Sequence, residues 1–194
     1  VLRTRAASAN LLGTFETGDV AIHDGGAFID TNSHNVTIAN NLQNATDKTG
    51  GLTKQGTGRL TLTGTNRYAG TTNVEGGSLW VGGSITSDVA IKDGGTLGGT
   101  GDVGAITIQL GGYIAPGNSP GILHSGSQTW EGGGGYQWEI TAVSGDAGSQ
   151  WDLLDIQGDL TLTATAENPF SIDLYTLSIG GAAAGLGGFD GTLP

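Results

Sequence analysis

Five Gly-Gly pairs, each followed by a short strand-like segment, constrain this sequence more than any other feature. Their second glycines are Gly26, Gly51, Gly77, Gly95 and Gly112. A repeat of roughly 17 to 26 residues is typical of a solenoid, in which each repeat forms one coil and cannot bury its core alone. The repeat therefore predicts a rod, and it indicates a scaffold more strongly than it indicates any chemistry.

The composition favours β-structure and disfavours several classes of partner. Glycine supplies 38 of the 194 residues and no long apolar pattern of helical period occurs, so we expect strands joined by tight turns. The net charge of −11 disfavours nucleic acid and anionic membrane surfaces as partners. The absence of cysteine excludes disulfides and thiolate metal sites. No stretch approaches the roughly 18 apolar residues of a membrane span, so we expect no membrane insertion in this segment.

Short runs of alternating apolar residues accompany the glycine pairs. Val36 and Ile38 alternate with polar residues, and Leu60 and Leu62 do the same. In each run we expect the apolar residues to face one side, with threonine, asparagine or lysine on the other. Short strands with one wet face predict an all-β fold, a right-handed parallel β-helix (β-solenoid) of roughly seven to nine coils.

The regular repeat ends near residue 124. We therefore predict a β-helix repeat region at residues 1–124 and an aromatic-richer C-terminal β segment at residues 125–194, which forms wider coils or a cap. Within that segment three residues of one parity are expected to face the core: Tyr136, Trp138 and Ile140. The tail from Gly180 is expected to be flexible or incomplete.

One part of the repeat region carries a family resemblance. Residues 51–64 read GLTKQGTGRLTLTG, residues 66–72 read NRYAGTT, and residues 77–79 read GSL. This pattern resembles the autotransporter-associated β-strand repeat, and the likeness extends over roughly residues 20–124. The resemblance implies a right-handed parallel β-helix in an exported, cell-surface or secreted bacterial protein. It implies no particular activity, because such repeats form stalks beneath adhesins, proteases and other modules. The first residues lack the apolar run of a signal peptide, so we expect a mature product or a fragment.

Candidate catalytic residues are sparse. Four carboxylates near aromatic residues are the candidates for an acid–base pair: Glu131, Glu139, Asp152 and Asp155. We expect them to be solvated charges at strand edges, since no arginine or lysine accompanies them. The histidines are isolated beside turn residues and are expected at the surface: His23, His34 and His124. No Gly-x-Ser-x-Gly motif in a strand–turn–helix context supports a Ser-His-Asp triad. We predict no catalytic residue and no enzymatic activity.

Calcium ligation has two weak signals. Residues 98–102 resemble the start of a calcium-binding nonapeptide, but the aspartate falls one position early and no tandem copy follows. Asp24 and Asp93 lie beside glycine pairs, where they are equally suited to ligate calcium or to accept turn hydrogen bonds. We predict no metal site and no cofactor.

Trp80 is the one candidate for contact with a ligand or partner. It lies between Leu79 and Val81, so its indole points outward if those two residues face the core. An exposed tryptophan is a stacking platform for sugars or a packing contact for another chain. Lateral packing on the next coil is the alternative.

These observations predict a structural stalk, adhesin or fibre segment of a bacterial exported surface protein, located outside the cell or on its surface. Strand edges at the solenoid ends favour self-association into filaments. The expected partners are other copies of the chain, other surface proteins and glycans. The alternatives are a carbohydrate-binding module that uses Trp80, or a glycan-cleaving β-helix enzyme that uses the acidic residues near Trp138 and Trp151.

Overall fold

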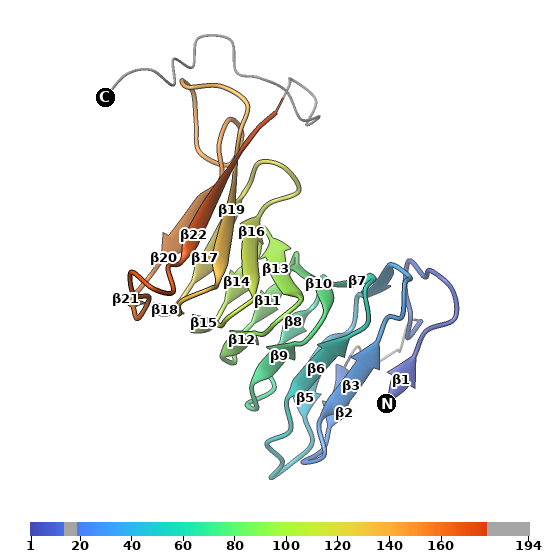
Figure 1. Ribbon diagram of the computed structural model, residues 1–194. Coiled ribbons are helices and arrows are strands. Elements are labelled where there is room, and N and C mark those ends of the chain that lie inside the picture. Colours follow the sequence, from blue (N-terminus) through green and yellow to red (C-terminus); the bar gives the residue numbers. More distant parts are fainter. Residues whose placement is uncertain (14–18, 178–194) are drawn as a thin grey trace.

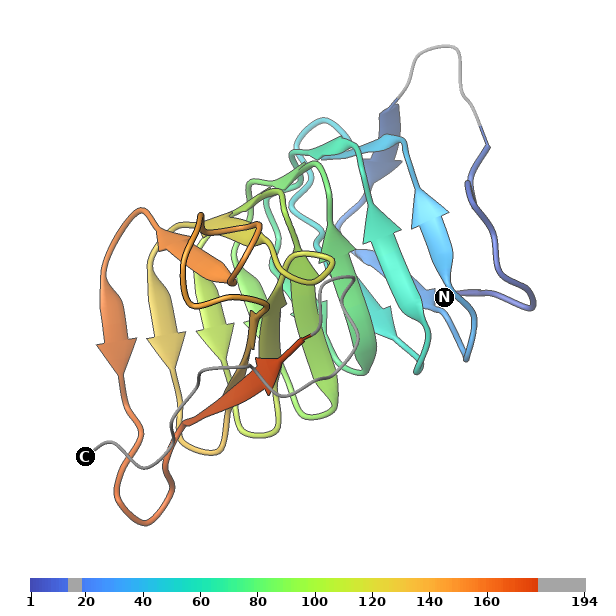
Figure 2. The same ribbon diagram turned by 90° about the horizontal axis from the view of Figure 1, so that it is seen from above.

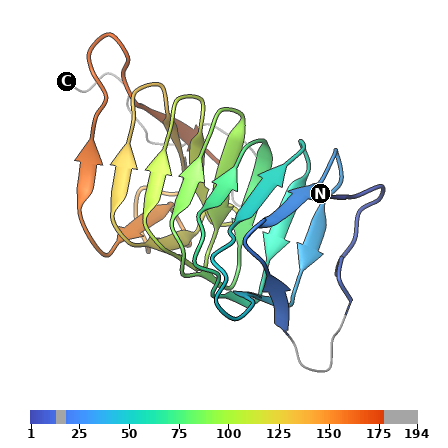
Figure 3. The ribbon, with the colours of Figure 1, turned by 90° about the horizontal axis from the view of Figure 1, so that it is seen from below.

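The protein is a stack of coils made entirely of strands and turns in the described residues, 1–13 and 19–177 of a computed structural model. Figure 1 shows the strands following one another in sequence order from one end of the stack to the other. The views from above and below show neighbouring strands lying side by side along the stack (Figures 2 and 3). The expected all-β parallel β-helix is confirmed. No helix long and apolar enough to cross a membrane occurs among the described residues.

Three long parallel sheets form the walls of the described stack. The first sheet has eight strands, in the order β1 (Leu2–Arg3), β3 (Ala27–Asp30), β6 (Leu52–Gln55), β9 (Thr72–Val74), β12 (Val89–Ile91), β15 (Ile106–Ile108), β18 (Gln128–Trp130) and β21 (Leu160–Leu162). The second has seven, β4 (Val36–Ile38), β7 (Arg59–Leu62), β10 (Gly77–Val81), β13 (Gly95–Gly99), β16 (Tyr113–Pro116), β19 (Gly135–Ile140) and β22 (Ser171–Thr176). The third has five, β8 (Thr65–Asn66), β11 (Ser84–Ile85), β14 (Asp102–Val103), β17 (Ile122–Ser125) and β20 (Leu153–Ile156). A two-stranded sheet joins β2 (Asp19–Ile22) to β5 (Asn41–Asn44).

Each coil visits the three sheets in turn. The chain passes from β6 to β7 to β8 and then returns to the first sheet as β9, one coil further along. Every strand in the three sheets pairs in parallel with its counterpart in the next coil, as when Leu79 lies opposite Leu60 on one side and Leu97 on the other. Equivalent residues of successive coils therefore form columns.

The core consists of the inward-facing columns. In the second sheet one such column contains Val36, Leu60, Leu79, Leu97 and Ile114, all of them buried. Towards the C-terminal end aromatic residues take over, and the Trp130 ring stacks on Phe170 at a centroid distance of 4.5 Å. The expected inward parity of Tyr136 and Ile140 is confirmed by their burial, and Trp138 is half-buried against the same core.

Beyond residue 124 the strands continue the same three sheets. β18, β19 and β20 pair with β15, β16 and β17, and β21 and β22 begin a further coil. Two connections are longer than their counterparts in the preceding coil: residues 141–152 between β19 and β20, and residues 163–170 between β21 and β22. The boundary between residues 124 and 125 remains a prediction. The tail expected from Gly180 onward lies outside the described residues.

The Gly-Gly repeat marks two different corners of the coil. The pairs that end at Gly26 and Gly51 precede strands of the first sheet, whereas those that end at Gly77, Gly95 and Gly112 lie where strands of the second sheet begin. The interpretation of the five pairs as one position of one repeat was therefore wrong. The step from Gly51 to Gly77 therefore does not measure one coil, because it spans one coil and the passage to the next corner.

Close approach between successive coils requires glycine at the second corner. Register places Gly95 directly after Gly77 in the column, and a Cβ atom on Gly95 would overlap the carbonyl oxygen of Val74. The neighbouring backbone cannot retreat without breaking the ladder of hydrogen bonds between coils.

Gly95→Ala is therefore expected to lower the free energy of unfolding by about 1–3 kcal/mol, the usual cost of overpacking a closely packed site. Gly25→Ala is the matched control, because a Cβ atom at Gly25 meets no atom within 4 Å and its φ angle is not in the left-handed region. Urea denaturation measures both. Equal stability of the two variants would contradict the close approach at Gly95.

Candidate functional site

A lysine occupies a core position near the N-terminal end of the stack. Lys54 lies in β6 between Ile29 and Val74 of the adjoining coils, in a column that is otherwise apolar as far as Trp130. Its side chain is fully buried. The expectation that lysine would lie on the wet face of these strands was wrong for Lys54. The alternation with Leu52, which shares its parity, was the signal that could have placed it inside.

The Lys54 ammonium group binds the backbone of the corner that follows β6. Its Nζ donates hydrogen bonds to the carbonyl oxygens of Gln55 (3.1 Å), Gly56 (2.8 Å) and Gly76 (2.8 Å). The last of these belongs to the next coil, so one side chain ties two coils together. Burial lowers the pKa of Lys54 to about 8, and the negative charge of Asp30 opposes this shift. Three carbonyl dipoles thus stabilise a charge that the core otherwise disfavours.

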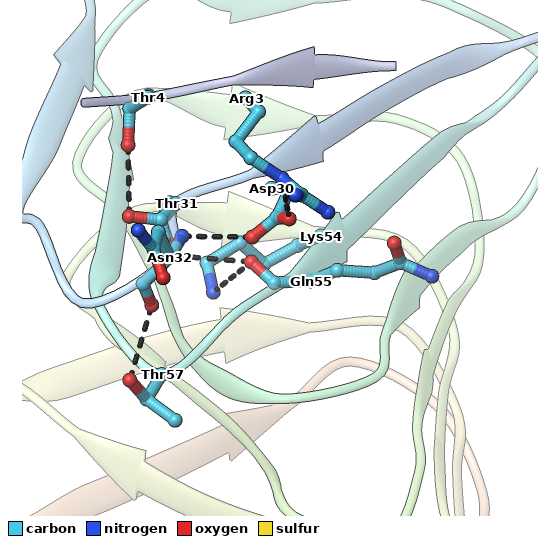
Figure 4. A network of polar contacts seen from close by, with 8 residues as sticks. All are labelled: Arg3, Thr4, Asp30, Thr31, Asn32, Lys54, Gln55 and Thr57. Atoms are coloured by element: carbon cyan, nitrogen blue, oxygen red, sulfur yellow. Dashed lines mark hydrogen bonds and ion pairs between the residues drawn. The ribbon is translucent and has the colours of Figure 1, made fainter.

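Asp30 anchors the outer side of the same network (Figure 4). It accepts hydrogen bonds from the backbone N–H of Asn32 at 2.8 Å and from Nε of Arg3 at 2.7 Å. The pKa of Asp30 is lowered chiefly by the Asn32 hydrogen bond and further by the Arg3 charge. The buried Thr31 hydroxyl lies nearby and donates to a backbone carbonyl of the following coil. The network therefore links the first three coils.

Three further polar residues of the repeat motif are also buried: Asn66, Tyr68 and Thr72. Asn66 donates to the carbonyl oxygen of Ser84 (2.9 Å) and accepts from the N–H of Leu42 (3.1 Å), so it joins three successive coils. The hydroxyl of Tyr68 lies 2.7 Å from Oγ1 of Thr72, and both residues are fully buried. Burial raises the pKa of Tyr68 far above its usual value. These three residues hold the coils together and do not reach the surface, whereas Arg59 and Thr61 of the same motif face outward.

Trp80 lies on the outer face of the second sheet. Leu79 and Val81 beside it are fully buried, so the expected outward direction of the indole is confirmed. The ring packs over Gly98 of the next coil, where a Cβ atom would lie 3.2 Å from Cε2 of the indole. The guanidinium carbon of Arg59 lies 5.3 Å from the ring centroid. Trp80 packs on the next coil and also forms one wall of a surface groove. Its contact with a ligand or partner stays a prediction.

The carboxylates that were candidates for catalysis occupy very different environments. Asp152 is buried and accepts hydrogen bonds from the N–H groups of Gly121 (2.8 Å) and Glu139 (2.9 Å). Burial raises the pKa of Asp152 to about 7, the two hydrogen bonds partly offset this rise, and the nearby Glu139 charge adds to it. The expectation that Asp152 is a solvated charge was therefore wrong. Both of its oxygens are used to hold the 141–152 turn on the stack.

The histidines give one unexpected contact. Nδ1 of His124 lies 2.8 Å from Oδ2 of Asp155, so His124 is not isolated as expected and Asp155 is not simply solvated. Both side chains are partly exposed, and such a pair adds about 0–1 kcal/mol at most. His23 lies at the surface as expected, and His34 is half-buried.

The aspartates considered for calcium lie apart from one another. Asp24 accepts a hydrogen bond from the N–H of Thr49 at 3.0 Å and pairs with Lys48, which is the turn-stabilising role. Asp102 begins β14 on the third sheet, across a corner from Gly98. In residues 1–13 and 19–177, no three carboxylate or imidazole side chains gather closely enough to hold a metal ion.

A pH titration of stability tests the buried charge of Lys54. As pH rises through about 8 the folded protein releases this proton, whereas the unfolded chain keeps it until about 10.5. The unfolded state binds more protons in this window, so the free energy of unfolding rises with pH. Relative to Lys54→Met, the wild type should gain up to about 3 kcal/mol between these pH values. The buried phenols of Tyr68 and Tyr136 are present in both proteins and cancel in the difference. A difference that does not change with pH would contradict the lowered pKa of Lys54 in the folded protein.

Comparison with known proteins agrees with this geometry. The family described as passenger-associated-transport-repeat matches residues 52–81, which run from β6 to β10 and include Lys54, Asn66, Tyr68 and Thr72. An extracellular serine protease of Serratia marcescens is 51% identical over 75 residues, which is 39% of this chain and 7% of that protein. The adhesin BmaC autotransporter of Brucella suis is 37% identical over 112 residues, or 55% of this chain and 3% of that protein.

A third relative is the autotransporter lipoprotein NalP of Neisseria meningitidis, which is 43% identical over 60 residues, or 31% of this chain and 6% of that protein. The chain thus spans only a small part of the length of each of these relatives. The residues that match the repeat, 52–81, contain the buried polar side chains whose contacts are described above. Residues 52–81 therefore carry a passenger-associated-transport-repeat, and the expected location outside the cell or on its surface is confirmed.

Proposed function

We propose that this segment is a structural stalk, a rigid part of a surface protein that carries or spaces other parts and does not itself catalyse a reaction. One observation supports this proposal above all. Four polar residues of the repeat motif, Lys54, Asn66, Tyr68 and Thr72, are buried and bind neighbouring coils. Residues kept for catalysis would need access to a substrate, and these have none.

The environment of the carboxylates also favours a stalk. A general acid or base must lie within hydrogen-bonding reach of its substrate. Asp152 has a pKa near neutrality, as catalytic carboxyl groups often do, but it is only 2% exposed and both oxygens accept backbone hydrogen bonds. Its unusual pKa therefore has a structural cause. The extracellular serine protease of Serratia marcescens matches this chain over only 7% of its own length, so its name does not by itself assign catalysis to this chain.

Adhesion is the role that we propose for the whole protein. The relative from Brucella suis is called an adhesin, and its match extends over the largest part of this chain among the relatives described above. A stalk suits adhesion because it holds a contact surface away from the cell. The outer faces of the sheets, which the core does not use, are the surfaces available for this purpose.

Removal of one whole coil tests the stalk. In a solenoid each coil contacts only its neighbours, so deletion of residues 89–105 should leave a folded protein in which Ile106 takes the register of Val89. We expect a retained β-sheet circular dichroism spectrum, a cooperative melt and a modest fall in stability.

The matched control deletes residues 89–97 and so ends inside β13. This change joins a corner of the first sheet to the middle of a second-sheet strand, and it should abolish the cooperative melt. If both deletions unfold the protein, the coils do not act as interchangeable units and the stalk proposal fails.

An activity assay tests the absence of catalysis. The protein incubated with neutral and acidic polysaccharides and with casein should release no more reducing ends or peptides than buffer alone. Measurable cleavage that is lost in Glu139→Gln or Asp152→Asn, with the fold retained by circular dichroism, would replace the stalk with a glycan-cleaving enzyme.

End-to-end association into filaments is a second candidate, and the ends of the stack favour it. In β21 and β22, several apolar residues of the inward columns are exposed: Leu160, Leu162, Ile172 and Leu174. At the other end a hollow of about 380 Å³ has an apolar lining that includes Leu2, Val20 and Phe28. Open strand edges with apolar side chains are prone to pair with another chain.

Sedimentation velocity at increasing concentration tests this association. The wild type should form species larger than a monomer, and Leu162→Lys with Leu174→Lys should remain monomeric because both charges block the C-terminal end. Thr61→Lys with Thr96→Lys, on the side of the stack, is the control and should associate as the wild type does. A wild type that stays monomeric at all concentrations would exclude filament formation by this segment.

A further inference from the structure

A groove of about 100 Å³ lies at the outer end of the second sheet, where β7, β10 and β13 approach the turn around Asn118. Its lining is Arg59, Thr61, Trp80, Val81, Gly82, Gly99, Thr100 and Asn118. We propose that this groove binds an acidic saccharide, with a sugar ring against the Trp80 indole and its carboxylate or sulfate group beside the Arg59 guanidinium. The proposal does not depend on the stalk function.

The chemistry of the lining matches a saccharide. An indole offers an apolar surface to the C–H face of a pyranose, and its ring is fixed here by packing over Gly98. The hydroxyls of Thr61 and Thr100 and the amide of Asn118 both donate and accept hydrogen bonds, as sugar hydroxyls require. Thr100 and Asn118 are exposed, so the groove opens to solvent.

The charge of this face selects an anion. Although the protein carries a net charge of −11, no carboxylate occurs at the outward positions of the described strands β7, β10, β13 and β16. These positions hold Arg59, Thr61, Ser78, Trp80, Thr96, Gly98, Tyr113 and Ala115. The outer face of the first sheet differs, since Asp30 and Glu75 lie there with Lys92. An acidic ligand would therefore meet little repulsion at β7 to β16, whereas the outward positions of β19 and β22 in the same sheet hold Glu139 and Asp173.

Arg59 is placed to hold the anion. It forms no ion pair with any carboxylate in the described part of the chain, whereas Arg3, Lys48 and Lys92 each have an acidic partner. Its Nε is buried and makes no hydrogen bond to any described residue. The contact with Trp80 holds the guanidinium at the wall of the groove. A carboxylate or sulfate beside it would supply the charged acceptor that this side chain lacks.

The small volume of the groove limits how much of a saccharide it can hold. A groove of about 100 Å³ accepts an acidic substituent and one edge of a sugar ring, and the rest of the saccharide would lie along the open face. Tyr113 lies on the same outer face, in β16, two coils beyond β10. It offers a second aromatic surface to a longer saccharide. We therefore expect weak binding to one unit and stronger binding to an oligomer.

Isothermal titration calorimetry with three hexasaccharides tests the proposal. The probes are oligogalacturonate, which carries carboxylates, a heparin-derived hexasaccharide, which carries sulfates, and neutral maltohexaose. At least one acidic probe should bind with a dissociation constant of about 0.1–1 mM at low salt, and maltohexaose should not bind measurably. The two acidic probes show which anion the groove prefers.

Variants locate the binding site. Arg59→Gln should weaken the acidic probe by about tenfold or more, the effect of losing one charge-assisted hydrogen-bonding group. Lys92→Gln is the matched control, because it removes the same charge from the outer face of the first sheet, and it should change the affinity less than about twofold. Trp80→Ala should abolish binding, and Trp80→Phe should retain part of it if the ring provides the contact. Circular dichroism and melting temperature confirm that each variant is folded.

Three results would overturn the proposal. The first is failure of both acidic probes to bind the wild type at millimolar concentration. The second is equal weakening by Arg59→Gln and Lys92→Gln, which would show a general charge effect. The third is equal binding of maltohexaose, which would show that the groove does not select an anion.

Discussion

The ladder of hydrogen bonds between successive coils is the constraint on which the rest of the structure depends. Each strand pairs in parallel with the equivalent strands one coil before and one coil after, so the register of one coil is inherited by the next. This forces residues into columns in which every member meets the same geometry. A column can change only where its neighbours can accommodate the change. The positions of glycine, of apolar residues and of buried polar groups all follow from this rule.

Corners are the weak points of such a ladder, because there the backbone turns and some carbonyl groups lose a partner in the next strand. Lys54 satisfies three of them, and it extends from the first sheet to a carbonyl of the next coil to do so. At the third sheet the neutral side chain of Asn66 donates hydrogen bonds to two such carbonyls, those of Gly64 and Ser84. An unpartnered buried carbonyl costs about 1–3 kcal/mol, so several polar residues in a narrow core stabilise it rather than weaken it. The corner after β6 thus requires a long side chain with several donors.

The fold class could be predicted from the sequence because period-2 alternation and glycine spacing report directly on strands and tight turns. Val36, Ile38, Leu60 and Leu62 lie inward for this reason. For Lys54 the two signals disagree. Its polarity predicts exposure, which is wrong, whereas the parity that it shares with Leu52 predicts burial. The assignment of the glycine pairs to a single corner failed because glycine is needed wherever two coils approach closely, and such places occur at more than one corner.

The environments of Asp152 and His124 could not be predicted, because their partners lie in other coils. Gly121 and Asp155 are each 31 residues away from the groups they bind, and the variable turns near the C-terminal end hide that register in the sequence. Trp80 was easier to place, since its direction depends only on its immediate neighbours. Trp80 could be placed and the other two could not for a physical reason. The direction of a side chain in a strand depends on its immediate neighbours, whereas its partners in other coils depend on the number of residues in each coil.

The solenoid separates the groups that maintain the fold from those available for recognition. The inward polar residues of the repeat, such as Lys54 and Asn66, have their hydrogen-bonding groups occupied by backbone contacts, so they stabilise the rod without specifying a ligand. Side chains at outward positions are not needed to hold the coils together, since only the backbone of these residues joins the hydrogen-bond ladder. At the second sheet these positions hold small residues at Gly98 and Ala115, which leave room for the Trp80 ring beside Arg59. Substitutions on this face can change what the rod binds while the columns that form the rod remain intact.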